Sequence, residues 1–238
     1  MRIREIIVYG DSTSLPRPTD SVDISNTYYW RLIQFLGYEC GLENRSTGAI
    51  NVKQLSQKVF DDSHYLFPKN FLNEKKLVII NVGVVDAALH PITYKLKAMR
   101  HIPIIGKYLW YIVAKILKPF KVQIMSIWKY SMTRPVKFSQ EFEKVIKFLV
   151  DRELLICVLL TPIPHKNLES RSPGICEKVK EYNLLKVKIC EKFPGVHVVS
   201  LDKFIDTFYV SALDGHHYSK SGHNYVFDEI KSKLFLND

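Results

Sequence analysis

The sequence predicts an α/β protein with a flavodoxin-like three-layer sandwich around a central five-stranded parallel sheet. Two observations predict this class. Strand-like segments alternate along the chain with segments of helical periodicity. The clearest strands are apolar throughout, which is typical of strands buried on both faces of a parallel sheet. Right-handed crossovers then favour a doubly wound sheet, for which 2-1-3-4-5 is the expected strand order.

The expected strands are Ile3–Tyr9, Gly41–Ser46, Lys76–Val82, Leu154–Leu160 and Val196–Leu201. The expected helices are Asn26–Tyr38, Asn51–Phe60, a helix from Ser139 to about Arg152, a helix from Pro173-Gly174 to about Phe193, and Ser219–Phe235. Ser139 is predicted to be an N-cap because two glutamates follow it in what would be the first turn.

Length and composition predict one domain over residues 1–238, with an insertion at about 90–134 after the third strand. A hydrophobic fraction of 47% is ordinary for a globular protein and argues against disorder. The four cysteines have neither CxxC nor zinc spacing, so we expect free thiols in a reducing compartment. No signal peptide precedes the first strand, so we expect a cytoplasmic location.

The stretch Gly10-Asp11-Ser12 follows the first strand, where a parallel sheet presents its carboxyl edge. A hydroxyl held there needs only a base to become a nucleophile. Alone, this stretch is equally typical of an ordinary β-turn. However, Gly48, Gly83–Asp86 and Asp214–His217 fall in loops that open on the same edge. This gathering favours an active site.

These blocks resemble those of the SGNH, or GDSL-type, hydrolases. Gly10-Asp11-Ser12 matches the first block, with Thr13 in place of the usual leucine, and Gly48 matches the second. Asp214-Gly215-His216-His217 matches the last, Asp-x-x-His. The resemblance implies that Ser12 is the nucleophile, His217 the general base and Asp214 the residue that orients the imidazole. It also implies an oxyanion hole from the backbone N–H groups of Ser12 and Gly48. His216 is the competing base.

The third block of this family is Gly-x-Asn-Asp, whereas this chain has Gly83-Val84-Val85-Asp86. Valine lacks the side-chain donor of the family's asparagine, and losing one oxyanion donor typically costs about 100- to 1000-fold in turnover. Three interpretations are open: another residue donates, the enzyme is slow or tuned to another acceptor, or the site binds without turnover. The substitute donors considered are Asn81, Asn44 and Arg45. Candidate substrate contacts in these loops are Asp11, Arg17, Arg45, Val85 and Asp86.

The first block continues as Asp11-Ser12-Thr13-Ser14-Leu15-Pro16-Arg17, and the third reads Gly-hydrophobic-Val-Asp. Both resemble a branch of SGNH-like proteins that occurs with bacterial surface-polysaccharide biosynthesis. That resemblance implies a small-molecule or glycan ester as substrate. The leading hypothesis is a serine esterase. The alternatives are an O-acyltransferase to a sugar hydroxyl and a catalytically weak glycan-binding or scaffold protein. No cofactor and no metal are expected, because no convincing ligand spacing accompanies the histidines.

The net charge of +10 belongs to one segment. Between Asp86 and Glu141 there is no acidic residue, but there are ten basic ones: Lys95, Lys97, Arg100, Lys107, Lys115, Lys118, Lys121, Lys129, Arg134 and Lys137. Within it, residues 102–118 are apolar and aromatic but carry lysines, which fits an interfacial helix better than a membrane span. The alternatives are a lid over the active site and a surface for a partner protein. We do not expect a nucleic-acid partner, and the sequence predicts no oligomeric state. Docking would place the protein at the inner face of the membrane.

Overall fold

The structure is a computed structural model that describes residues 3–67, 75–90, 102, 105–201, 209–211 and 214–236. Its strands form one parallel sheet in the order β2-β1-β3-β4-β5, which confirms the predicted order. The strand bounds are β1 Ile3–Gly10, β2 Gly41–Asn44, β3 Lys75–Asn81, β4 Leu155–Leu159 and β5 Val196–Val199.

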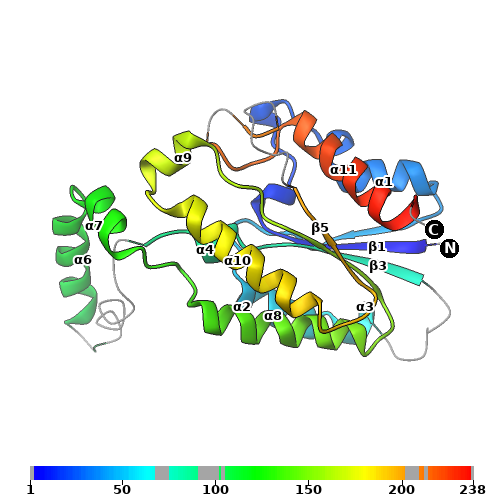
Figure 1. Cartoon of the computed structure of the whole chain (residues 1–238), viewed down its shortest axis with the longest axis horizontal. Coiled ribbons are helices and arrows are strands. Elements are labelled where there is room, and N and C mark those ends of the chain that lie inside the picture. The colour runs from blue at the N-terminus through cyan, green and yellow to red at the C-terminus, as the bar shows by residue number, and fades with distance from the viewer. Residues whose placement is uncertain are drawn as a thin grey trace.

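Helices cover both faces of this sheet, as the predicted three-layer class requires (Figure 1). One face carries α2 (Val52–Asp61), α8 (Pro135–Val150) and α10 (Ile175–Cys190). The other carries α1 (Tyr28–Leu36) and α11 (Lys220–Phe235). Alternate residues of β1 enter the two cores: Ile7 and Tyr9 pack on the first face, and Ile6 and Val8 on the second. This two-sided burial explains why the strands read as continuous apolar runs.

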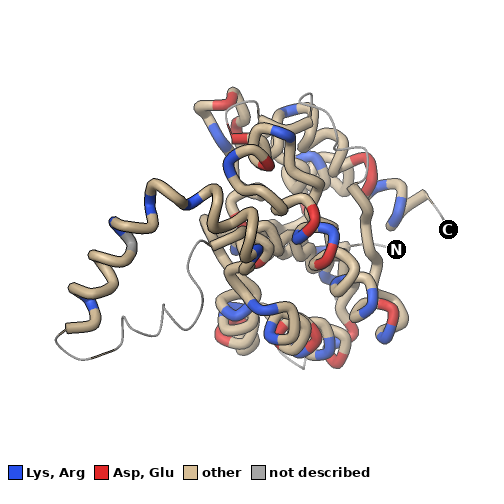
Figure 2. The backbone as a smooth tube through the Cα atoms, turned by 60° about the vertical axis from the view of Figure 1, so that its left-hand side comes forward, with Lys and Arg blue, Asp and Glu red and all other residues tan. Residues whose placement is uncertain are grey.

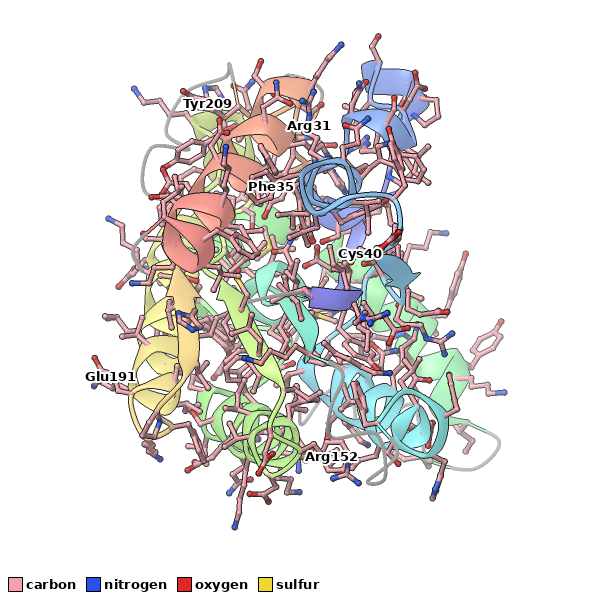
Figure 3. All side chains as sticks on the ribbon, turned by 90° about the vertical axis from the view of Figure 1, so that its right-hand side faces the viewer. Arg31, Phe35, Cys40, Arg152, Glu191 and Tyr209 are labelled. Carbon is pink, nitrogen blue, oxygen red and sulfur yellow. The ribbon has the colours of Figure 1, made fainter. Side chains whose placement is uncertain are left out.

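The outer helices meet through aromatic contacts as well as through the sheet. Phe35 of α1 faces α11 (Figure 3), with its ring centroid 5.5 Å from that of Phe235 and 6.2 Å from that of Phe227. The cysteines are free thiols, as predicted, and Cys40, Cys157 and Cys190 are buried.

The predicted N-cap at Ser139 is wrong. Helix α8 begins at Pro135, with Arg134 as its N-cap, so Ser139 lies inside the helix. Proline at the first helical position is favourable because its missing N–H has no partner there in any case. Phe138 and Phe142 are both completely buried, and an earlier start is needed to bring Phe138 onto the core face. The other predicted helix bounds differ from the structure by up to three residues.

Short elements build the loops at the carboxyl edge of the sheet. They are η1 Ser12–Ser14, η2 Pro18–Asp20, η3 Ile24–Asn26, α3 Ser63–Leu66, α4 Val84–Ala87 and α9 Lys166–Arg171. Of these, η1 follows β1, α4 follows β3, and α9 follows β4. The amino-terminal end of β1 lies at the opposite end of the molecule (Figure 1).

The insertion after β3 contains helices α6 (Gly106–Leu117) and α7 (Lys121–Trp128), which we call the arm. The arm projects from the body beyond the carboxyl edge of the sheet (Figures 1 and 2). Its base is closed by hydrogen bonds from His90 N to Tyr130 O (2.7 Å) and from Met132 N to Ala88 O (2.8 Å). Parts of the predicted insertion, residues 91–101 and 103–104, lie outside the described residues. In the part of the chain that the structure describes, no helix is long and apolar enough to cross a membrane.

Candidate active site

Ser12 stands at the start of the turn that follows β1. The carboxylate of Asp11 holds this turn, because its Oδ1 accepts hydrogen bonds from Thr13 N (2.9 Å) and Thr13 Oγ1 (2.6 Å). A Cβ at Gly10 would lie 2.3 Å from Ser14 Oγ and 2.8 Å from Ser46 Oγ, so only glycine lets the turn close this tightly. Asp11 is only 1% exposed. The prediction that Asp11 contacts the substrate is therefore wrong. Asp11 instead holds the turn through its hydrogen bonds to Thr13.

The loop before α11 brings His217 to Ser12 across 205 residues of sequence. His217 Nε2 lies 2.8 Å from Ser12 Oγ, and His217 Nδ1 lies 2.7 Å from Asp214 Oδ2. The second carboxylate oxygen of Asp214 accepts the backbone N–H groups of His216 and His217, each at 3.1 Å. In the Asp-x-x-His block, the aspartate side chain thus closes the turn by accepting hydrogen bonds from the backbone of the residues that follow it. The structure brings the three predicted catalytic residues together in one chain of hydrogen bonds.

Electrostatics keep His217 neutral and Asp214 charged. Burial, reinforced by the neighbouring His216, lowers the pKa of His217 to about 4 although Asp214 opposes the shift. Burial alone would raise the pKa of Asp214, but hydrogen bonds from Arg17 and from the two backbone N–H groups hold it well below its ordinary value. At neutral pH the site therefore holds an unprotonated imidazole between a hydroxyl and a carboxylate, which is the arrangement a general base needs.

Two arginines hold the Asp214 loop, and only one of them was predicted to lie at the site. Arg17 donates to Asp214 Oδ2 and pairs through Nε with Asp20 Oδ2 at 3.0 Å. Arg17 is thus engaged by the carboxylate of Asp214 and acts as a positioning residue, not as the predicted substrate contact. Arg171, at the end of α9, donates from Nη2 to the backbone carbonyl of Asp214 at 2.8 Å. No sequence signal marked Arg171, because its partner is a backbone atom on a distant loop.

A buried polar network ties the nucleophile turn to β3 and to the histidine loop. The amide of Asn81 donates to Ser14 Oγ (2.8 Å) and Thr13 Oγ1 (3.1 Å), and its oxygen accepts from Tyr218 OH (3.2 Å). Ser14 Oγ also shares a hydrogen bond of 2.9 Å with Tyr28 OH. Asn81 therefore fixes the relative positions of residues 12 and 217, and its amide is not available as an oxyanion donor.

Neither of the other two substitute donors lines the cavity beside Ser12. Arg45 pairs with Asp62 (2.9 and 2.7 Å) and donates to Tyr65 OH (2.7 Å), so its predictions as donor and as substrate contact are both wrong. Asn44 Oδ1 accepts from Ser46 N at 3.0 Å, and this side chain holds its own loop. Val85 lines the cavity beside Ser12 but can donate nothing.

The backbone N–H groups of Ser12 and Gly48 are the remaining candidates for the oxyanion hole. Neither donates a hydrogen bond to another described residue. Pairing with β1 continues beyond β2, with Arg45 N to Val8 O at 2.8 Å and Thr47 N to Gly10 O at 3.0 Å. This pairing brings the loop that contains Gly48 to the end of β1. The role of both N–H groups stays a prediction.

Asp86 does not face the cavity. Its side chain is completely buried, and its two oxygens accept from Val52 N (3.2 and 3.0 Å) while one also accepts from Thr133 Oγ1. Burial raises the pKa of Asp86 to about 6. Asp86 thus joins α4, the start of α2 and the base of the arm, and its prediction as a substrate contact is wrong.

A buried lysine lies beneath the third block. Lys186 of α10 is completely buried, and its Nζ donates to Leu159 O (3.1 Å) and Thr161 Oγ1 (3.0 Å). Burial lowers the pKa of Lys186 to about 8, against the opposing charges of Asp11 and Asp86. Gly83 has φ of +131°, and a Cβ there would lie 3.0 Å from Lys186 Nζ. Both its conformation and this close approach require glycine.

A cavity of about 530 Å³ opens beside Ser12. Its wall is mostly aliphatic, with contributions from Val84, Val85, Leu89, Met132, Leu168 and Ile175. Lys121, Arg171 and His216 add polar groups. The ring of His216 packs on that of His217 with centroids 4.0 Å apart, so the competing base lines the cavity while His217 contacts the hydroxyl. Such a cavity can hold the acyl chain of an ester next to the nucleophile.

Among the described residues, Asp214, His216 and His217 offer ligand atoms within 4.8 Å of one another, as a metal site would require. However, Asp214 Oδ2 already accepts from Arg17 and His217, and His217 Nε2 is directed at Ser12. A cation would have to displace Arg17 and break the contact with the hydroxyl. The arrangement therefore fits acyl transfer better than metal binding.

The sequence matches no family model and no curated protein. Solved structures do resemble the fold. An acetylxylan esterase from Geobacillus stearothermophilus superposes with a TM-score of 0.61 at 13% identity, over 99% of this chain and 97% of its own. A lipase/acylhydrolase from Enterococcus faecalis gives 0.60 at 14%, over 96% and 93%. A member of the lipolytic G-D-S-L family from Veillonella parvula gives 0.57 at 12%, over 98% and 99%.

The chain has the SGNH/GDSL hydrolase fold. This result confirms the fold that the resemblance of the four sequence blocks implied. In this SGNH fold the first and last blocks meet as described above, and the third block departs from the usual pattern at Val85.

Proposed function

We propose that the protein is a serine esterase that cleaves an acyl ester through an acyl-Ser12 intermediate. The observation that carries this proposal is the continuous hydrogen-bonded series Ser12, His217 and Asp214, placed at the wall of an apolar cavity. Neutral His217 supplies the base, and charged Asp214 stabilises the imidazolium that forms.

In the proposed reaction, Ser12 Oγ attacks the carbonyl carbon of the ester while His217 Nε2 takes the hydroxyl proton. The backbone N–H groups of Ser12 and Gly48 bind the oxyanion of the tetrahedral intermediate. The carbon–oxygen bond to the alcohol then breaks, and the alcohol leaves with the proton from His217. A water molecule, deprotonated by His217, attacks the acyl-serine and releases the carboxylic acid.

We further propose a carbohydrate or glycan ester as the substrate. Support comes from the resemblance of the Asp11–Arg17 stretch to the polysaccharide-associated branch, and from fold neighbours that include acetylxylan esterases. The second candidate is an O-acyltransferase, in which a sugar hydroxyl replaces water as the acceptor. The valine at position 85 removes one oxyanion donor, which lowers turnover for hydrolysis and for transfer alike.

Hydrolysis of p-nitrophenyl acyl esters of increasing chain length tests the esterase proposal. The wild-type protein should release p-nitrophenol, and Ser12→Ala should lose about 1000-fold or more of this activity. Ser170→Ala, an exposed serine on α9, is the matched control and should keep full activity. Activity that survives Ser12→Ala would refute the proposal. Product analysis with and without a sugar acceptor separates transfer from hydrolysis.

A further inference from the structure

We propose that the arm docks on the surface of an anionic lipid bilayer and holds the mouth of the active site against it. The arm is defined by α6 and α7, and it projects from the body in both views (Figures 1 and 2). The proposal goes beyond ester cleavage, because it concerns where the protein works.

The first observation is an exposed apolar stripe on α6. Ile105, just before the helix, and Leu109, Ile112 and Ile116 recur at the spacing of one helix face. Their side chains are 59%, 38%, 41% and 60% exposed, respectively. A neighbouring stripe of Trp110, Val113 and Leu117 is half-buried. Helix α6 thus leaves about half of its apolar face in water, which a globular protein normally avoids.

The second observation is the charge of the arm. At roughly 100° per residue, Lys115 borders the stripe and Lys107 lies on the opposite side of α6, while Lys118 directly follows the helix. None of these three, nor Lys121, forms an ion pair with a described residue. No Asp or Glu occurs in the arm, which Figure 2 shows as blue on tan. An exposed apolar face on a segment whose only charges are unpaired lysines is complementary to lipid tails and anionic headgroups together.

The third observation is the set of exposed aromatic residues on the arm. Tyr108, Tyr111, Phe120 and Trp128 are all at least 48% exposed. Amphipathic aromatic rings are favoured at the level of lipid headgroups, where one part is apolar and the other hydrated. Helix α6 has 12 residues and is about 18 Å long, well short of the ~30 Å hydrocarbon core, so it would lie in the interface and not cross it.

The arm is connected to the active site. Lys121, the first residue of α7, lines the cavity beside Ser12, as do Leu89 and Met132 at the base of the arm. No described residue of α6 lines that cavity, so this helix is not positioned as a lid over it. A second copy of the chain is a poor occupant for the stripe, because the arm carries lysines and no acidic residue, so two paired arms would repel each other. The charge therefore favours an anionic surface.

Vesicle flotation with the full chain tests the proposal. The probe is a vesicle of phosphatidylcholine and phosphatidylglycerol at 3:1, compared with phosphatidylcholine alone, each at low and high salt. We expect binding to the anionic vesicles, at least about tenfold weaker binding to the neutral ones, and weakening by salt. Leu109→Gln/Ile112→Gln/Ile116→Gln should lower binding at least about tenfold, and so should Lys107→Gln/Lys115→Gln/Lys118→Gln.

The matched controls change equally exposed residues outside the arm. Tyr38→Gln/Leu184→Gln/Leu236→Gln and Lys53→Gln/Lys147→Gln/Lys188→Gln should bind vesicles like the wild type. All variants should keep hydrolysis of a soluble p-nitrophenyl ester within about twofold, which separates a failure of docking from a failure of the esterase proposal. No binding of the wild type, equal binding to neutral vesicles, or unchanged binding of the stripe variant would each overturn the proposal. A dimer that the stripe variant abolishes, without vesicle binding, would assign the stripe to a second copy instead.

Discussion

The carboxyl edge of the sheet, with the loops that hold Ser12 and His217, differs from the arm in how its side chains are partnered. At the edge, Asp11, Asn81 and Asp86 are almost fully buried, and each has protein partners at hydrogen-bond distance. In the arm, large apolar side chains and lysines face solvent, and Met125 is the one described large apolar side chain there that is fully buried. The polar side chains of the edge are paired within the protein, whereas the exposed side chains of the arm are suited to contact with a partner.

From this difference we infer that the edge determines the reaction, whereas the arm determines where the protein binds. The edge positions Ser12 and His217 through a network that needs no ligand, so it should be ready for chemistry in isolation. Changes at the edge should therefore alter turnover and stability together. Changes in the arm should alter neither, provided the substrate is soluble.

The largest expected effect contrasts the two adjacent histidines. His217→Gln should lower kcat/KM for a p-nitrophenyl ester by about 1000-fold or more, because it removes the group 2.8 Å from Ser12 Oγ. His216→Gln changes a side chain that packs on the His217 ring and lines the cavity but does not contact Ser12 Oγ, so it should cost less than about tenfold. Steady-state kinetics of the two variants make the comparison. Equal losses would show that the assignment of the base is wrong.

The next effect is on stability. Asn81→Ala removes three buried hydrogen bonds, to Thr13 Oγ1, Ser14 Oγ and Tyr218 OH, each of which contributes about 0.5–1.5 kcal/mol. We expect the free energy of unfolding to fall by at least about 2 kcal/mol in urea denaturation. Gln57→Ala, an exposed position on α2, is the control and should stay within about 0.5 kcal/mol of the wild type. An equally small change for Asn81→Ala would mean that the network does not hold the edge.

The pH dependence gives a smaller effect with a defined sign. His217 acts only when unprotonated, and its pKa lies near 4, so kcat/KM should be level at neutral pH and should fall as pH drops through about 4. Arg17→Gln removes a positive charge that lowers the pKa of His217, so the acid limb should move to higher pH. Arg152→Gln, at the far end of the sheet, should leave the limb in place. A limb near pH 6.5 in the wild type would contradict the burial argument.

The smallest effect is expected in the arm. Ile112→Gln replaces a side chain that is already 41% exposed, so it should change the free energy of unfolding by less than about 0.5 kcal/mol. Thermal or urea denaturation checks this, with Val145→Gln in the core of α8 as the contrast that should unfold the protein. A large loss from Ile112→Gln would show that the stripe packs on the body and is not free for a partner.

The class of sheet could be predicted from buried apolar runs that alternate with helices, and the strand order is the usual one for that class. The meeting of Ser12 with His217 was implied by the resemblance of the short blocks at strand ends to those of a known family. The sequence could not predict what each polar residue in those blocks contacts. Asp11, Arg45 and Asp86 were expected to face the substrate, but all three hold loops. Asp11 and Asp86 accept hydrogen bonds from backbone N–H groups, and Arg45 pairs with Asp62, 17 residues further along the chain. Asn81 and Arg171 were missed as positioning residues for the same reason. Side-chain pairing across loops has no sequence periodicity to reveal it.

The central claim is that Ser12 is a nucleophile activated by His217. Labelling with a fluorophosphonate, followed by peptide mapping with mass spectrometry, tests it most directly, because the probe phosphonylates only an activated serine. We predict one adduct, on the peptide that contains Ser12, no adduct in Ser12→Ala, and labelling slowed at least about 100-fold in His217→Gln. An absent adduct, an adduct on another serine, or an unchanged rate in His217→Gln would contradict the account.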